Sequence, residues 1–247
     1  LDFGSFVSPK AIPQMRDTAE VLRKLDFTGA RSKLLAIIAN TRGGEDACMF
    51  DEIQYLGYPF SISETFQQRN TNASIEESLV RVGEIAELCV KHKKELVVYI
   101  SMGFGNPYGD PWSPELAASW SSRLYREFDV KLIALSDTVG VATPDTIGSL
   151  FNTVIRELPE VEFGAHLHSV PSDVISKMDA ALQAGCRRFD GAIKGFGGCP
   201  MATDKLTGNM PTELMVDHLR HIGYEQSLDQ EAFTGALRLA ADVFSSH

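Results

Sequence analysis

Residues 131–168 read KLIALSDTVGVATPDTIGSLFNTVIRELPEVEFGAHLH, and their pattern indicates the fold class. An apolar run at 131–137 is followed by an amphipathic helical pattern at 143–158 and by a second apolar run at 162–168. The helical pattern opens on Thr143, a preferred N-cap residue. A strand, a helix and a second strand in this order predict a parallel strand pair joined by a right-handed crossover.

The same alternation extends along the chain in both directions. Seven strands are expected, at 1–5, 33–39, within 53–62, and at 95–102, 131–137, 162–168 and 187–193. Helices are expected at 12–25, 43–50, 74–94, 113–128, 143–158, 171–185, 211–222 and 229–244. Ser74 with Glu77 forms a capping-box pattern, and Gly185 is suited to a helix C-terminus. Since no low-complexity linker interrupts the alternation, we expect one domain over 1–247.

Such an α/β alternation either closes as a barrel or remains an open, doubly wound sheet, and periodicity alone does not choose between them. No GxGxxG motif follows the first strand, which counts against a dinucleotide-binding open sheet. We therefore favour a TIM-type (β/α)8 barrel. Because that barrel closes with eight strands, and the chain opens in mid-strand at LDFGS, we expect a first βα unit of on the order of 30 residues to precede Leu1.

Composition limits the possible partners and the compartment. The 247 residues are 44% hydrophobic and carry a formal net charge of -10, which argues against a nucleic-acid partner. The four cysteines show neither zinc-site spacing nor the density of a disulfide framework, which favours a reducing compartment. No apolar run approaches the roughly 20 residues that cross a bilayer, so we expect no membrane partner.

His166 and His168 stand at the end of an expected strand. The strand period of two turns both side chains to the same side. At the carboxyl end of a barrel strand they would face the mouth, where enzymes on this fold place their chemistry. Two converging imidazoles suggest a metal site. The alternative is a pair of hydrogen-bonded interior histidines.

The segment GFGGCPMATDKLTGNMPTE at 195–213 follows the last expected strand. Its three glycines before Cys199 suit a loop that closes over a substrate. The alternative is an ordinary connection in which Cys199 is a small hydrophobic residue. Asn209 supplies either a neutral oxygen ligand or a helix cap.

Two aspartates also lie in strand segments. Asp137 comes at the end of one strand, and Asp2 lies in the first. Both would face the mouth of the barrel as functional groups. The alternative for each is to cap the helix that follows.

Taken together, these segments resemble the 3-hydroxy-3-methylglutaryl-CoA lyases, a family of the DRE-TIM metallolyase superfamily, nearly from end to end. The segments that carry the resemblance, in the order and spacing of the family, are SFVSPKAIPQM (5–15), SETFQQRNTNASIEES (63–78), YISMGFGNPYGD (99–110), LSDTVGVATP (135–144), HLH (166–168), GGCP (197–200) and GNMPTE (208–213). GGCP is the most specific, because related synthases that make isopropylmalate or homocitrate carry a Gly-Glu-Arg loop there. SVPSD at 169–173 departs from the family's Asp-Thr-Tyr-Gly type of sequence.

The resemblance implies a metal shell of His166, His168 and Asn209 that holds Mg²⁺ or Mn²⁺. In the family, a carboxylate from an Arg-Asp pair on the first strand completes this shell, and no such pair precedes Leu1. Three further carboxylates match acidic residues near the family's site, namely Asp2, Asp137 and Glu213.

The activity implied is a metal-dependent retro-Claisen cleavage of 3-hydroxy-3-methylglutaryl-CoA to acetyl-CoA and acetoacetate. His166 or Asp137 would take the hydroxyl proton, and the Cys199 thiol would protonate the enolate carbon. Two alternatives stay open: another acyl-CoA aldol or Claisen enzyme of the superfamily, and an inactive homologue that binds CoA esters. The resemblance also implies a homodimer with a role in leucine degradation and ketone body metabolism, in the bacterial cytoplasm or the mitochondrial matrix.

Overall fold

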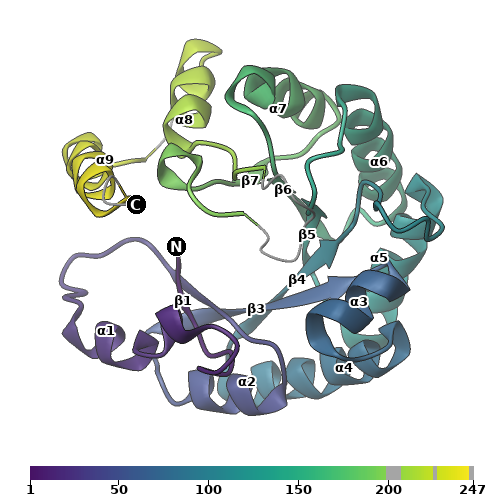
Figure 1. Ribbon diagram of the computed structural model, residues 1–247, viewed down its shortest axis with the longest axis horizontal. Coiled ribbons are helices and arrows are strands. Elements are labelled where there is room, and N and C mark those ends of the chain that lie inside the picture. Colours follow the sequence, from purple (N-terminus) through teal and green to yellow (C-terminus); the bar gives the residue numbers. More distant parts are fainter. Residues whose placement is uncertain (199–206, 225–226, 245–247) are drawn as a thin grey trace.

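The computed structural model describes residues 1–198, 207–224 and 227–244, which contain one parallel sheet of seven strands with helices around it (Figure 1). The strands are β1 (Asp2–Ser5), β2 (Leu34–Ile37), β3 (Ile53–Ser61), β4 (Glu95–Ser101), β5 (Leu132–Asp137), β6 (Glu162–Leu167) and β7 (Arg188–Asp190). Their order in the sheet follows the chain, and every neighbouring pair is parallel. The expected α/β alternation is thereby confirmed.

The helices lie on the outside of this sheet. They are α1 (Thr18–Lys24), α2 (Thr41–Cys48), α3 (Glu64–Thr71), α4 (Ile75–His92), α5 (Pro114–Phe128), α6 (Pro144–Glu157), α7 (Val174–Gln183), α8 (Thr212–His221) and α9 (Gln230–Phe244), with short 3₁₀ turns η1 (Pro13–Met15), η2 (Pro171–Asp173) and η3 (Ile193–Gly195). None of the helices in the described residues is both long and apolar enough to span a membrane.

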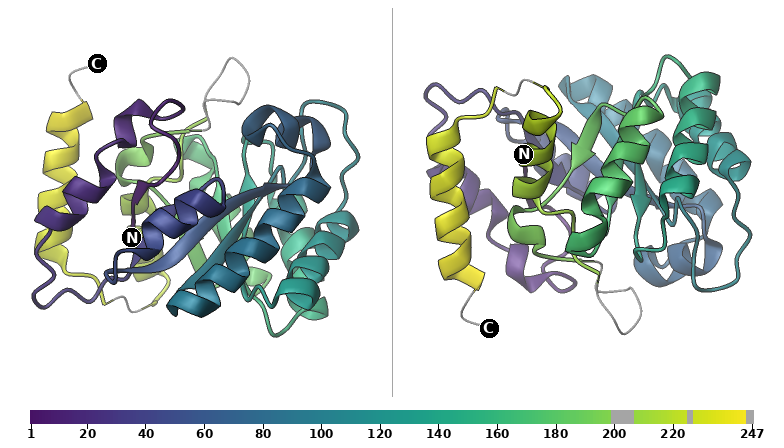
Figure 2. Two further views of the ribbon diagram at one scale, coloured as in Figure 1. Left: turned by 90° about the horizontal axis from the view of Figure 1, so that it is seen from below. Right: turned by 90° about the horizontal axis from the view of Figure 1, so that it is seen from above.

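The sheet curls like part of a barrel, with the helices on its convex side (Figures 1 and 2). Within the described residues no strand joins β7 to β1, and α8 and α9 lie on the side where these two edges face each other. This curled parallel sheet with outer helices confirms the TIM-type fold predicted from the sequence, with seven strands in the described residues.

The two faces of the sheet have different environments, as β3 shows. The Tyr58 hydroxyl lies 2.9 Å from the Ser78 hydroxyl of α4, and the Phe60 ring packs on Trp120 of α5 with centroids 5.5 Å apart. Both strand side chains are fully buried against the helices. The intervening Pro59 points to the concave side, where it lines a pocket. The core therefore lies between sheet and helices, and the concave face is left for a site.

Helix starts follow the local signals read from the sequence. Ser74 and Glu77 form the expected capping box of α4. The side chains of Ser113 and Thr143 accept backbone N–H groups at the starts of α5 and α6. Gly185 has φ +97°, a conformation that a glycine adopts without strain. These short-range contacts depend only on neighbouring residues, so the sequence predicts them well.

Three boundaries differ from expectation. The helix predicted at 12–25 is divided into η1 and α1, because Asp17 has ψ 14° and leaves the helical conformation. The helix α3 was not expected; Ser63 caps it, and Asn72 ends it in the left-handed region. The last strand, predicted over 187–193, pairs with β6 only along Arg188–Asp190, and Ala192 forms an isolated parallel bridge with Pro211.

Candidate active site

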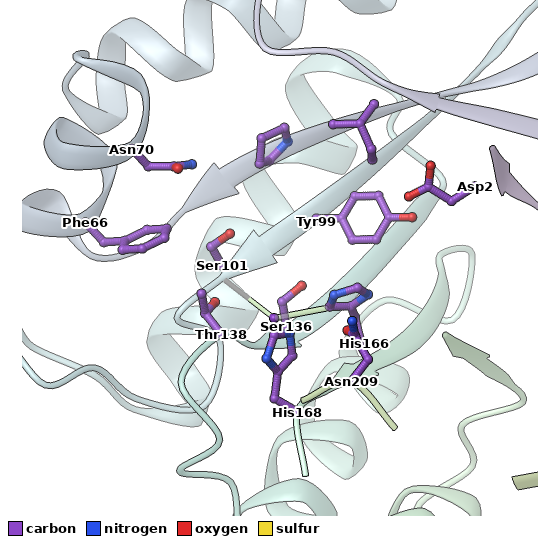
Figure 3. A pocket seen from close by; sticks show the side chains of 13 residues that line it. Asp2, Phe66, Asn70, Tyr99, Ser101, Ser136, Thr138, His166, His168 and Asn209 are labelled. Atoms are coloured by element: carbon purple, nitrogen blue, oxygen red, sulfur yellow. The ribbon is translucent and has the colours of Figure 1, made fainter. Parts of the chain in front are cut away.

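A pocket of about 300 Å³ lies on the concave side of the sheet (Figure 3). Its lining residues come from the first six strands, from α3 and from the segments after β7: Asp2, Ile37, Pro59, Phe66, Asn70, Tyr99, Ser101, Ser136, Thr138, His166, His168, Gly198 and Asn209. Many of them lie at or just beyond the carboxyl ends of their strands. Enzymes with (β/α)8 barrels place their chemistry at this end.

His166 and His168 both line the pocket, with ring centroids 5.7 Å apart (Figure 3). The expectation that both face the mouth is confirmed. His166 Nδ1 lies 3.1 Å from Asp190 Oδ2, and His168 Nδ1 lies 3.0 Å from the carbonyl oxygen of Thr207. Because each Nδ1 faces an acceptor, we assign the proton to Nδ1, which leaves each Nε2 with a free lone pair. Metal-binding histidines are commonly held in this way.

Burial affects the charge of one of these rings. His168 is 5% exposed, and its pKa is lowered to about 4, mainly by burial and also by the neighbouring His166. The His168 imidazole is therefore neutral at pH 7. Only a neutral imidazole offers a nitrogen lone pair to a metal.

Asn209 reaches the histidines from the segment that precedes α8. It forms an isolated antiparallel bridge with His168, and the Ser169 N–H donates to the Gly208 carbonyl at 3.0 Å. The Asn209 Nδ2 donates to the Phe196 carbonyl at 2.9 Å. With the amide nitrogen held in this way, Oδ1 is the amide atom that remains available to a ligand.

Asp2 also lines the pocket, on the side of Tyr99 (Figure 3). Although part of its surface reaches solvent, the pKa of its carboxyl is raised to about 6, mainly by desolvation and also by the negative charge of Asp190. The positive form of His166 acts in the opposite direction. The Tyr99 ring of β4 meets the His166 ring of β6 edge to face, with centroids 5.3 Å apart.

Ser136 provides an independent sign that a ligand belongs in this pocket. Its hydroxyl is buried and has no hydrogen-bond partner among the described residues. An unpaired buried hydroxyl costs roughly 1–3 kcal/mol, so such groups usually have a partner. A polar substrate atom or a water in the pocket would supply one.

The donor set fits a divalent cation only when the amide is included. Among the residues that the structure describes, no group of three or more His, Cys, Asp or Glu side chains is placed to hold a metal. Two imidazole nitrogens and the Asn209 oxygen converge on one pocket, with their other polar atoms already engaged. Mixed nitrogen and oxygen donors suit Mg²⁺ or Mn²⁺ when water or substrate oxygens complete the shell.

Asp137 requires a correction. Its side chain is fully buried, and it accepts backbone N–H groups of Val141 and Ala142 at 2.8 and 3.0 Å. The Lys177 ammonium lies 3.3 Å from the same carboxylate. Asp137 does not line the pocket, so the expectation that it faces the mouth is wrong. Its carboxylate instead holds the turn after β5, because three donors already occupy it.

Glu213 lies outside the pocket lining as well. Its carboxylate accepts the backbone N–H of Lys194 at 2.9 Å, and Lys194 has φ +56°. This hydrogen bond stabilises η3, which lies at the start of the glycine segment.

The glycine segment reaches the pocket at Gly198, which is one of the lining residues. Gly195 and Gly197 have φ of +68° and +89°, as expected for glycines that bend a loop. Cys199 follows directly and lies outside the described residues.

Sequence reasoning missed two residues that contact the histidines, one at the His166 ring and one only at the His168 backbone. Asp190 ends β7 and contacts His166; a strand-end aspartate was the available signal. Lys177 is 5% exposed within α7 and donates to the His168 carbonyl at 2.9 Å as well as to Asp137. A lysine in a helix gives no sequence signal of burial.

Comparisons with known proteins agree on one family. Residues 12–240 match the profile of the HMGL-like family. The chain is 33% identical over 232 residues to a hydroxymethylglutaryl-CoA lyase of Pseudomonas mevalonii, a match that covers 94% of this chain and 76% of the relative. It is 31% identical to a 3-hydroxy-3-isohexenylglutaryl-CoA/hydroxymethylglutaryl-CoA lyase of Pseudomonas aeruginosa, over 96% of this chain and 77% of the relative.

Solved structures give the same result. The HMG-CoA lyase of Bacillus subtilis superposes with a TM-score of 0.88 at 29% identity, over 98% of this chain and 80% of that one. An HMG-CoA lyase of Acinetobacter baumannii, in complex with coenzyme A and 3-methylmalate, has a TM-score of 0.87 at 29% identity, over 98% of this chain and 78% of that one.

Proposed function

The chain belongs to the HMGL-like family, and on that premise we propose that it cleaves 3-hydroxy-3-methylglutaryl-CoA to acetyl-CoA and acetoacetate with a divalent cation. The observation that carries the proposal is the pair His166 and His168, each with its Nδ1 held by an acceptor and its ring in the pocket beside Asn209. Since both rings line the pocket, this arrangement suits metal binding better than a pair of hydrogen-bonded interior histidines.

His166, His168 and Asn209 would hold the cation. When bound there, Mg²⁺ or Mn²⁺ would supply Lewis-acid stabilisation of the negative charge that develops on the substrate oxygens. Asp190 and the Thr207 carbonyl fix the two rings, so the ligand atoms are positioned before the cation arrives.

The reaction moves one proton off the substrate and one back onto it. A base takes the proton of the C3 hydroxyl, the C2–C3 bond breaks, and C3 becomes the ketone carbon of acetoacetate. The bond electrons remain on C2 as an enolate of acetyl-CoA. We propose that the Cys199 thiol donates the proton to C2, because Gly198, its neighbour in the chain, lines the pocket.

His166 has two proposed roles that exclude each other in a single step, since one Nε2 cannot both bind a cation and accept a proton. Asp190 supports either role, because a carboxylate on Nδ1 orients a ligand and also stabilises an imidazolium. Mn²⁺ titration of His166→Gln separates the two roles. A lost affinity assigns His166 as a ligand, and a retained affinity with lost turnover assigns it as the base.

An acetoacetate assay tests the function directly. The chain would be treated with a chelator and assayed on HMG-CoA with and without added Mg²⁺ or Mn²⁺. We expect acetoacetate only in the presence of the cation. Absence of acetoacetate under all conditions would contradict the proposal.

A second candidate is a longer 3-hydroxy-3-alkylglutaryl-CoA, since the Pseudomonas aeruginosa relative is named for such a substrate as well. The apolar side of the pocket, formed by Ile37, Pro59 and Phe66, would contact the alkyl group. A panel of 3-alkyl substrates, compared by kcat/KM, distinguishes the two.

We further propose that the protein is a homodimer and that it is located in the bacterial cytoplasm or the mitochondrial matrix. Analytical sedimentation would test the first proposal, and cell fractionation would test the second.

A further inference from the structure

Helix α9 lies on the side of the molecule where the edges of β7 and β1 face each other (Figures 1 and 2). All 15 of its residues are described, and none of them is buried. In its second half, the partly buried residues 236, 237, 240 and 241 lie along one helical face. By the helical period, Phe244 continues that face and Leu239 lies on the opposite side. Phe244 is therefore the last side chain that α9 turns toward the rest of the molecule.

The Phe244 ring stacks on the ring of Phe196, with centroids 4.1 Å apart and ring planes at 27°. Phe196 directly follows η3, which is the element that α9 mainly contacts. Stacked aromatic rings attract each other beyond the effect of the apolar area that they cover. The pair thus attaches the end of α9 to the segment that follows β7.

This attachment falls at a point where the backbone itself is permissive. Gly195 and Gly197, on either side of Phe196, have φ of +68° and +89°. Glycines reach such conformations without strain, and they restrict the chain less than any other residue. The position of Phe196 therefore depends on what its ring and its carbonyl group contact.

The same segment packs closely on the one that carries Asn209. An added Cβ at Gly195 would lie 2.7 Å from the Asn209 carbonyl oxygen, and one at Gly208 would lie 2.7 Å from the Gly195 carbonyl oxygen. The Asn209 Nδ2 donates to the Phe196 carbonyl at 2.9 Å. Phe196 thus contacts α9 through its ring and the Asn209 side chain through its backbone.

The hydrogen bond to Phe196 determines which end of the Asn209 amide is free. The amide nitrogen is a donor and the oxygen an acceptor, so a cation can bind only the oxygen. While the Phe196 carbonyl holds Nδ2, Oδ1 is available. If the carbonyl is displaced, the amide can rotate about its terminal bond, because that torsion is broad.

We propose that Phe244 is a positioning residue for the metal ligand Asn209, an inference that rests on the function proposed above. Phe244 fixes the Phe196 ring, the Phe196 carbonyl holds the Asn209 Nδ2, and Oδ1 is left to the cation. Helix α9 is thereby part of the support of the site, although Phe244 does not line the pocket.

Calorimetric titration of Phe244→Ala with Mn²⁺ tests the proposal without turnover. The affinity should fall by about 2- to 10-fold, the range that the loss of one aromatic pair allows. The midpoint of thermal unfolding should change little, since Phe244 is 47% exposed. Phe244→Tyr keeps a ring that can stack, so it should bind Mn²⁺ like the wild type.

Leu239→Ala is the matched control on the same helix. Leu239 is 67% exposed and lies away from Phe196, so this variant removes a large apolar side chain without touching the stacked pair. We expect wild-type affinity for Mn²⁺. An equal loss in Leu239→Ala and Phe244→Ala would mean that α9 acts only as a cover, and the proposal would be overturned.

A double-mutant cycle shows whether Phe244 acts through Phe196. Phe196→Ala removes the ring and keeps the backbone carbonyl, and it should lower the affinity for Mn²⁺ about as much as Phe244→Ala does. The double variant should bind like either single variant, because both substitutions break the same contact. Additive losses would assign the two rings to independent roles and contradict the proposal.

The orientation of the Asn209 amide can also be followed without metal. Its Nδ2 hydrogens give a side-chain signal in ¹⁵N NMR spectra, assigned by its disappearance in Asn209→Asp. The signal should shift in Phe244→Ala and stay in place in Leu239→Ala. An unshifted signal together with wild-type Mn²⁺ affinity in Phe244→Ala overturns the inference, even if HMG-CoA is cleaved. If the wild type produces no acetoacetate, the proposed function fails, and this signal still decides whether Phe244 positions Asn209.

Discussion

The ends of β5 and β6 are neighbours in the sheet, but their polar side chains point to opposite faces of it. Ser136 pairs in register with His166, and Asp137 pairs with Leu167. Ser136 and His166 line the pocket. Asp137 and Leu167 are buried on the other side, where Lys177 of α7 meets the aspartate. Since successive residues of a strand face opposite sides, one position decides whether a polar group reaches substrate or a helix.

The residues on the two faces of the sheet should also contribute differently to activity and to stability. Pocket-side residues should control metal binding and turnover with little effect on stability. Helix-side residues should control stability, because their partners are buried protein groups. Substitutions on the two faces therefore test this division.

The largest expected effect is on the pocket side, just beyond the end of β6. His168→Ala should abolish both Mn²⁺ binding and turnover, because water cannot replace one of so few protein ligands in a catalytic geometry. Calorimetric titration with Mn²⁺ and the acetoacetate assay measure the two losses. An unchanged Mn²⁺ affinity would remove His168 from the ligand set.

Cys199→Ala tests the residue that follows Gly198 in the chain. It should lower kcat by about 100-fold or more, the usual contribution of a general acid, and leave Mn²⁺ affinity near that of the wild type. Steady-state kinetics with a parallel metal titration measure both quantities. A variant with native kcat would mean that Cys199 is only a small hydrophobic residue.

Asp190→Asn tests whether the Asp190 carboxylate positions the His166 ring. The neutral amide oxygen that replaces the carboxylate would be a weaker acceptor for the His166 Nδ1–H, and loss of such a contact lowers metal affinity by about 10- to 100-fold. The unfolding free energy should change little, since the Asp190 side chain is 28% exposed. An unchanged affinity for Mn²⁺ would mean that Asp190 does not position the ring.

On the helix side, Lys177→Met should have the smallest effect on metal affinity and a large effect on stability. It leaves the buried Asp137 carboxylate without its cation, which typically costs about 3–5 kcal/mol. The double variant Asp137→Asn with Lys177→Met should recover part of that loss, because no unpaired charge remains. Urea unfolding measures each variant. A stable Lys177→Met variant that no longer binds Mn²⁺ would place this pair in the active site and break the division.

Much of the fold follows from local features that the sequence displays. Alternating apolar strands and capped helices predict the parallel sheet, and the capping box at Ser74 forms as read. The spacing of His166 and His168 predicts that they share a face, because this depends only on the strand period. The division of the helix at 12–25 and the extra helix α3 were not predicted, since marginal helices depend on packing more than on propensity.

Local sequence patterns predict the strand and helix order, the shared face of the two histidines, and the bends at Gly195 and Gly197. The tertiary fold turns Asp137 away from the pocket and brings Asp190 to His166, and no local pattern in the sequence specifies either. The physical reason is that periodicity specifies which side chains of one strand point the same way. Which of the two faces meets the pocket depends on the register between strands and on the helices packed behind them.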